Sequence, residues 1–108
     1  MGIKIANNAS TTIQAAVFAT DTVVTVTGGS GSLFPTLGVG DYFYGTLVST
    51  AGGIEIVKVT ARSGDNMTIE RAQEGTVALP FPVHSRFELR VTAANLQAYI
   101  DSLDFLFL

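Results

Sequence analysis

The sequence has no cysteine, only one histidine and few basic residues. The absence of cysteine excludes disulfide frameworks and thiolate metal sites, and it leaves the redox compartment undetermined. A single histidine, His84, falls short of the several ligands that a transition-metal site usually needs. Six Lys and Arg against nine Asp and Glu give a net charge of −3, and the basic residues are scattered. The sequence therefore predicts no metal or other cofactor and no nucleic-acid partner.

Long hydrophobic runs are also missing. The N-terminal stretch MGIKIANNAS lacks the apolar centre of a signal peptide. The C-terminal LDFLFL is far shorter than the roughly 20 residues that cross a bilayer. We therefore expect a soluble protein without a membrane partner. With 108 residues, 47% of them hydrophobic, and eleven glycines, the chain suits one compact β-rich domain with a single core.

Five segments have the composition or alternation of strands. They are Thr22–Thr27, Asp41–Ser49, Ile54–Ala61, Asn66–Ala72 and Ser85–Val91. In the first, Val24 and Val26 share one face; in the last, Phe87, Leu89 and Val91 are predicted to face inward between charged neighbours. The stretch GGSGS after the first strand predicts a flexible turn, and RSGD predicts a hairpin loop with a glycine for positive φ.

From Thr92 onward the apolar period changes to that of a helix, with Thr92 as the candidate N-cap. The apolar stripe comprises Leu96, Tyr99, Ile100, Leu103 and Phe107. The sequence thus predicts one domain over residues 1–108 of the all-β, mainly antiparallel class. Residues 1–91 form a small β-barrel or β-sandwich of five to seven strands, and residues 92–108 form a short C-terminal helix and an apolar tail.

The segment Glu55–Thr76 carries seven of the fifteen charges. We expect these charges on the outward face of two paired strands and at their turn, where cross-strand charges keep a sheet soluble and in register. The residues concerned are Glu55, Lys58, Glu70 and Arg71. A solvated hairpin face is the favoured interpretation, and a face that docks a partner is the alternative.

Catalytic patterns are not found. His84 lies in a Pro-rich connection and is expected on a surface loop, and the adjacent Ser85 would point to the opposite face of a strand. GGSGS lacks the Lys-Ser/Thr of a phosphate loop, and Ser32 occupies the position where a nucleophile elbow needs glycine. The sequence therefore predicts that the protein is not an enzyme.

The last residues are strongly apolar and include Phe105, Leu106, Phe107 and Leu108. Left exposed, such a segment would be an aggregation hazard. Either it folds back over the open end of its own barrel, or it packs against a second copy or a neighbouring protein. The second alternative makes the domain an assembly unit.

Three stretches carry a family resemblance: LFPTLGVGDYFYGTLVS, IEIVKVTARSGDNMTIERAQEGT and SRFELRVTAANL. They resemble the small β-domain at the N-terminus of tail-fibre and tailspike proteins of tailed bacteriophages, which attaches the fibre to the particle. The resemblance spans roughly Ile3 to Leu96, and its most distinctive pieces are GDYFY, EIVKVTARSGD and R-x-QEGT.

The resemblance implies a virion structural protein of the tail, a fibre-attachment adaptor that packs against other virion proteins as a homo-oligomer, with the trimer as the state that the family suggests. At the matching positions, local geometry predicts a turn at Gly40-Asp41 and a place for Gly64 in the hairpin turn, and Arg71 and Glu74 are close enough in the sequence to pair at the bend before Gly75. Scaffold maintenance is the favoured role of each of these residues, and an interface role is the alternative. The candidate interface residues are Tyr99, Leu103, Phe105, Leu106, Phe107 and Leu108, with Arg71 and Glu74. The chain has no counterpart of a fibre's shaft and tip, so receptor binding and depolymerase activity are not carried over.

Two other functions stay open. A capsid decoration protein on the phage head would be equally structural but present in many more copies. A carbohydrate-binding module would use Tyr42 and Tyr44, which share one face of their strand, and exposure of both rings would favour it.

Overall fold

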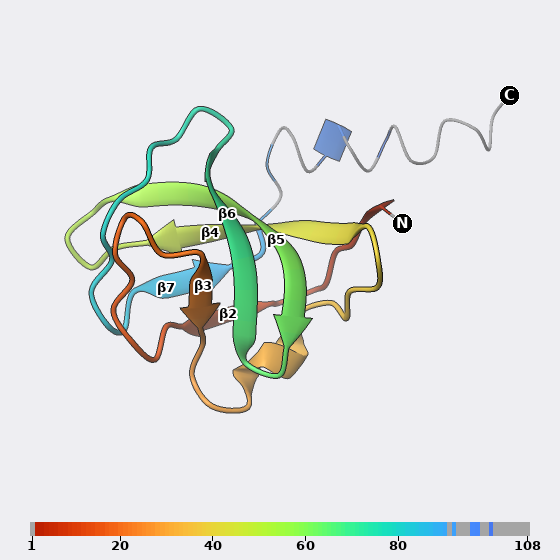
Figure 1. Ribbon diagram of the computed structural model, residues 1–108, viewed down its shortest axis with the longest axis horizontal. Coiled ribbons are helices and arrows are strands. Elements are labelled where there is room, and N and C mark those ends of the chain that lie inside the picture. Colours follow the sequence, from red (N-terminus) through yellow and green to blue (C-terminus); the bar gives the residue numbers. More distant parts are fainter. Residues whose placement is uncertain (1, 91, 93–95, 98–99, 101–108) are drawn as a thin grey trace, which may run out of the picture.

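The computed structural model describes residues 2–90, 92, 96–97 and 100 (Figure 1). Seven strands and one 3-10 turn are seen in these residues. The strands are β1 (Gly2–Ile3), β2 (Ser10–Thr12), β3 (Val23–Thr25), β4 (Asp41–Val48), β5 (Ile54–Ser63), β6 (Asn66–Gln73) and β7 (Arg86–Glu88), and the turn η1 (Ser30–Leu33) lies between β3 and β4.

All seven strands belong to one curled sheet of half-barrel shape (Figure 1). Six of them follow the order β2-β7-β4-β5-β6-β3, and β1 lies outside this order beside β4. Every neighbouring pair in this order is antiparallel, whereas β1 pairs in parallel with the start of β4. The two edges of the sheet approach each other at the Ile13–Val26 bridge, where the Thr27 amide also donates to the Thr12 carbonyl over 2.9 Å. The predicted all-β, mainly antiparallel class is confirmed, as a single curled sheet.

The hairpin between β5 and β6 is the longest regular element. Its register pairs Ser63 with Asn66, so that Gly64 and Asp65 form a two-residue turn. Gly64 has φ 61°, a value that glycine adopts without the steric cost of a Cβ. The expected hairpin and the role of its glycine are confirmed, with a loop shorter than RSGD.

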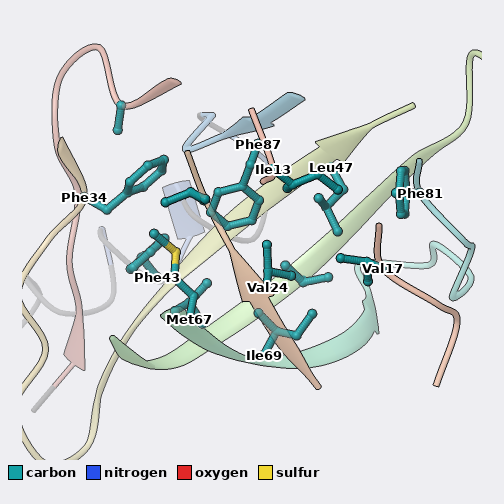
Figure 2. Packing of buried hydrophobic residues seen from close by; sticks show 14 residues of the cluster. Ile13, Val17, Val24, Phe34, Phe43, Leu47, Met67, Ile69, Phe81 and Phe87 are labelled. Atoms are coloured by element: carbon teal, nitrogen blue, oxygen red, sulfur yellow. The ribbon is translucent and has the colours of Figure 1, made fainter. Parts of the chain in front are cut away.

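The core fills the concave side of the sheet (Figure 2). The Phe34 ring stacks on Phe43 at a centroid distance of 5.7 Å and tilts against Phe87 at 5.3 Å. Gly45 lies in β4 beneath the Phe87 ring, and a Cβ built on it would come within 2.6 Å of Cε1 of that ring. A glycine in the strand interior is therefore required by the close approach of Phe87.

Part of the core comes from segments that the sequence did not assign to strands. Ile13 and Val17 follow β2, and Phe81 comes from the Pro-rich connection before β7; all three are buried. The expected alternation is confirmed for Val24 and Val26, which are fully buried.

β7 is shorter than predicted and ends at Glu88. Phe87 is buried and Leu89 packs against the core, so the inward face is confirmed for these two residues. Val91 lies outside the described residues.

The predicted C-terminal helix lies mostly outside the described residues, as do Tyr99, Leu103 and residues 105–108. Leu96, Gln97 and Ile100 are helical, and the Leu96 amide donates to the Thr92 carbonyl over 2.9 Å. Within the described part, nothing helical has the length and apolar content to cross a membrane.

Candidate functional site

A carboxylate lies fully buried at the start of β5. Glu55 has none of its surface exposed, although we expected it on the outward face; that prediction is wrong. Alternation along β5 explains the burial, because Glu55 shares its face with Val57 and Val59, which point into the core. The sequence already indicated this burial. Glu55 and Lys58 are three residues apart, and residues an odd number apart in a strand lie on opposite faces, so the two charges cannot both face outward.

Arg71 of β6 meets this carboxylate in a two-pronged ion pair. Its Nε donates to Glu55 Oε2 and its Nη2 to Glu55 Oε1, each over 2.8 Å. The Arg71 side chain is only 10% exposed. It lies on the same face of β6 as the buried Met67 and Ile69. Such planar, two-bond pairs are the strongest geometry available to arginine and a carboxylate.

Backbone groups satisfy the remaining hydrogen-bond donors of Arg71 and acceptors of Glu55. Arg71 Nη1 donates to the carbonyls of Phe18 and Asp21 over 2.6 and 2.9 Å, and Nη2 donates to the Leu79 carbonyl over 2.7 Å. Together with the two bonds to Glu55, these contacts use all five guanidinium donors. The Leu79 amide in turn donates to Glu55 Oε1 over 2.9 Å.

The fourth bond to the carboxylate comes from an irregularity in β6. The register of β5 and β6 shifts beside this site, and Ala72 has φ 56°. Its amide is turned to Glu55 Oε2 at 2.9 Å instead of extending the ladder. Each oxygen of Glu55 therefore accepts two hydrogen bonds.

The environment keeps Glu55 charged. Burial by itself would raise the pKa of this carboxyl, but the hydrogen bonds from Arg71, Leu79 and Ala72 and the charge of Arg71 outweigh it and lower the pKa below its usual 4.5. A carboxylate and a guanidinium with every bond used internally have no proton or lone pair ready for a substrate. The arrangement supports a structural role.

The ion pair joins two loops to the β5–β6 hairpin. Val17 and Phe81 pair between these loops through amide-to-carbonyl bonds of 2.9 and 2.8 Å in both directions. The Thr76 hydroxyl donates to the Gln73 carbonyl over 2.7 Å and accepts from the Ile56 amide over 3.1 Å. The loops over residues 17–21 and 76–81 are thus fixed to the sheet through polar contacts.

Comparison with protein-family models and with curated proteins found no match.

Glu74 follows the bend after Gln73 and has φ 52°. Its Oε2 accepts a hydrogen bond from the Thr92 hydroxyl over 2.7 Å. Because the guanidinium of Arg71 pairs with Glu55, the expected local Arg71–Glu74 pair is wrong. The interface roles of Arg71 and Glu74 stay predictions, although the internal contacts of Arg71 favour a framework role.

The two tyrosines lie together on the convex face. Their ring centroids are 5.7 Å apart in an edge-to-face arrangement, and Lys58 Nζ lies 4.5 Å from the Tyr42 centroid. Burial raises the pKa of Tyr44, with smaller contributions from neighbours that include Glu70. Both rings are only partly exposed, so the exposure that would favour carbohydrate binding is not met. Lys58 pairs in register with the exposed Glu70, as expected of cross-strand charges.

His84 is exposed in a turn, where we predicted a surface loop. Ser85 is fully buried and its Oγ donates to the Pro82 carbonyl over 2.7 Å, so this hydroxyl is committed to the backbone. Across the residues that the structure describes, no group of three or more His, Asp or Glu side chains is placed to hold a metal ion.

The GGSGS stretch is held in place by an aspartate that the sequence analysis did not connect to it. Asp65, in the hairpin turn, accepts from the Gly29 amide over 3.0 Å and from the Gly31 amide over 2.8 Å. These bonds lower the pKa of Asp65. The expected flexible turn is instead the 3-10 turn η1 with a fixed attachment to the hairpin.

Proposed function

We propose that the protein is a structural component of a tailed-phage virion, a fibre-attachment adaptor of the tail that acts by protein–protein packing and not by catalysis. The observation that supports this most is where the family-like motifs lie. They build the internal framework of the domain, as expected of a module whose task is to present a stable surface.

Each motif has a framework role. In GDYFY, Asp41 closes a turn by accepting from the Gly38 amide over 2.9 Å, and Gly40 has φ 81°. EIVKVTARSGD begins with the buried Glu55 and ends with Asp65, which binds η1. R-x-QEGT begins with the arginine of the ion pair. These roles agree with a shared scaffold and leave the partner-binding surface elsewhere.

The test is the copy number of the chain in purified phage particles, measured by quantitative mass spectrometry against the portal and major capsid proteins. A number equal to the portal's, or a small multiple of it, supports the tail adaptor. A number that scales with the major capsid protein supports the alternative, a decoration protein of the head. Absence from particles overturns both.

A further inference from the structure

An apolar patch lies on the convex face of the sheet, at the end of β4 and the start of β5. Alternation turns Val48, Ile54 and Ile56 outward, away from the buried side chains between them. The register pairs Val48 with Ile54, and it pairs Ile56 with the outward Thr46, so these side chains adjoin one another. Val48 and Ile56 are half-buried, and Ile54 is 50% exposed. We call Val48, Ile54 and Ile56 the convex patch.

The chain that leaves β7 crosses the same face. The Leu89 amide still donates to the Ala9 carbonyl over 2.9 Å, on the β2 side of β7. Three residues later, the Thr92 hydroxyl donates to Glu74 Oε2 over 2.7 Å, and Glu74 follows the end of β6. Three residues span at most about 11 Å, whereas β7 and β6 are separated by β4 and β5, about 14 Å in strand spacings. Thr92 and the Glu74 side chain therefore meet over β4 and β5, on the convex face, because the core fills the concave one.

Two further observations agree with this path. Burial and, to a smaller extent, the charges of Tyr42 and Glu74 raise the pKa of Tyr44, so the Glu74 carboxylate lies near the convex face of β4. Thr46 is only 3% exposed although its place in β4 turns it outward, as expected where other parts of the chain lie over the strand. The path from β7 toward the C-terminus is thus anchored above the convex face at Thr92.

The apolar end of the sequence begins within reach of the convex patch. Residues 103–108 are Leu-Asp-Phe-Leu-Phe-Leu, and ten residues separate them from Thr92. Val48 lies four residues beyond Tyr44 in β4, about 13 Å along the strand. Ten residues span about 15 Å even when they are helical, and more when they are extended.

This short connection favours the chain's own segment over that of a second copy. A short link gives the segment an effective concentration on the order of millimolar at the patch, which free copies in dilute solution do not reach. Leu96 and Ile100 are 51% and 46% exposed, so the residues available to cover the patch are the later ones. Apolar burial is the driving force on both sides of this contact.

We propose that residues 103–108 cover the convex patch of their own domain, as an apolar layer on the outside of β4 and β5. The contact buries phenylalanine and leucine side chains whose exposure promotes aggregation. The inference goes beyond the proposed function, because it concerns the free chain and holds whether or not the chain enters a particle. Contacts of the segment with a neighbour in an assembly then require its release from the patch.

Disulfide trapping on the full chain tests the contact, and the lack of native cysteine makes each introduced pair unambiguous. The test pair is Ile54→Cys with Phe107→Cys. The control pair is Val39→Cys with Phe107→Cys, because Val39 is fully exposed and lies five residues before Tyr44, whereas the patch begins four residues after it. At low protein concentration, we expect the test pair to form its intramolecular bond at least about tenfold faster than the control pair.

Non-reducing gels and mass spectrometry separate the intramolecular bond from disulfide-linked dimers. Equal rates in the two pairs overturn the proposal, since the segment then has no preference for the convex patch. Dimers that form faster than the intramolecular bond also overturn it and assign the patch to the segment of a second copy. Val48→Cys with Phe107→Cys is a second test pair, and circular dichroism of the reduced proteins checks that each is folded.

The contact between Thr92 and Glu74 gives an independent readout. Thr92→Val removes the hydroxyl that donates to Glu74 and keeps the shape of the side chain. In the test pair it should slow the intramolecular bond several-fold, because the chain loses its anchor above the convex face. In the control pair the rate should not fall. An unchanged rate in the test pair overturns the path on which the proposal rests.

Discussion

At the scale of the residue, the main feature is a buried pair of charges that the domain keeps at a considerable desolvation cost. Removing two ions from water is unfavourable by several kcal/mol per ion, on the order of the net stability of a small domain. The Glu55–Arg71 pair offsets this cost with two short bonds between the side chains and five to the backbone. The pair is therefore stabilising only as a complete unit.

A double-mutant cycle tests this unit. We expect Glu55→Gln and Arg71→Met each to lower the free energy of unfolding by about 3–5 kcal/mol, because each leaves a buried charge without its partner. The double variant should lose clearly less than the sum of the two, since no lone charge remains. Urea unfolding of the four proteins measures the coupling. If the loss of stability in the double variant equals the sum of the two single losses, Glu55 and Arg71 do not stabilise the domain as a unit.

The same carboxylate predicts how stability depends on pH. Its pKa is lower in the folded state than its usual 4.5, so the unfolded chain binds the proton more readily. Its contribution is therefore complete above about pH 4.5 and is lost as the pH falls through the folded-state pKa. In urea unfolding between pH 3 and 7, Glu55→Gln should weaken the acid dependence relative to wild type.

Glu88 supplies the control. Burial alone would raise its pKa, but bonds from Arg90, Arg86 and Ser10 lower it on the surface. Because Arg86 and Arg90 are exposed to solvent, Glu88→Gln should change the acid dependence less than Glu55→Gln does. An equal or larger change in Glu88→Gln would mean that the surface carboxylate, and not the buried one, determines the acid dependence of stability.

Individual residues were the hardest part to predict from the sequence. Alternation in β5 was sufficient to place Glu55 inward, yet the usual exposure of glutamate outweighed it in the prediction. The partners of Arg71 were beyond reach, because the Phe18 carbonyl is 53 positions away in the chain. Every residue has a backbone carbonyl, so the residue types in the sequence do not show which carbonyls Arg71 will bind.

At the scale of the element, β4 shows how one small residue sets the spacing of the core. The missing side chain of Gly45 lets the Phe87 ring of β7 lie against the strand and reach Phe34. A methyl group at this position would occupy the space of the ring, and close-packed interiors accommodate such additions poorly.

Gly45→Ala should therefore lower the free energy of unfolding by about 1–3 kcal/mol. Gly28→Ala is the matched control, because a Cβ there meets nothing within 4 Å, and it should change stability by less than about 0.5 kcal/mol. Thermal and urea unfolding measure both. Equal effects of the two substitutions would refute the packing explanation.

The elements that the sequence predicted are those whose signal is local. β4, β5 and β6 are long, alternate clearly and are joined by short turns, so their existence and order were expected. β1 and β2 have two and three residues, and they pair with strands far away in the chain. Segments this short carry too few residues to show a period, and their partners decide their structure.

At the scale of the whole molecule, self-association is expected to depend on the apolar end of the sequence. Replacing Phe105–Leu108 with four serines should leave the β-domain folded, because side chains between Ala9 and Phe87 already form a continuous buried cluster in the sheet. It should abolish oligomers and incorporation into particles. Sedimentation and particle mass spectrometry measure the two effects. Normal assembly would refute an assembly role, and unfolding would assign the segment to the domain's own core.

The position of the buried ion pair has a consequence for the order in which the chain folds. Both of its residues belong to a hairpin with a two-residue turn, so they meet through a contact of short sequence separation. Such contacts form early, because little loop-closure entropy opposes them. The carbonyls of Phe18 and Leu79 then bind to a guanidinium already held in place. We expect the β5–β6 hairpin to act as the folding nucleus, and the Phe18 carbonyl, which is 53 positions from Arg71, to join it later.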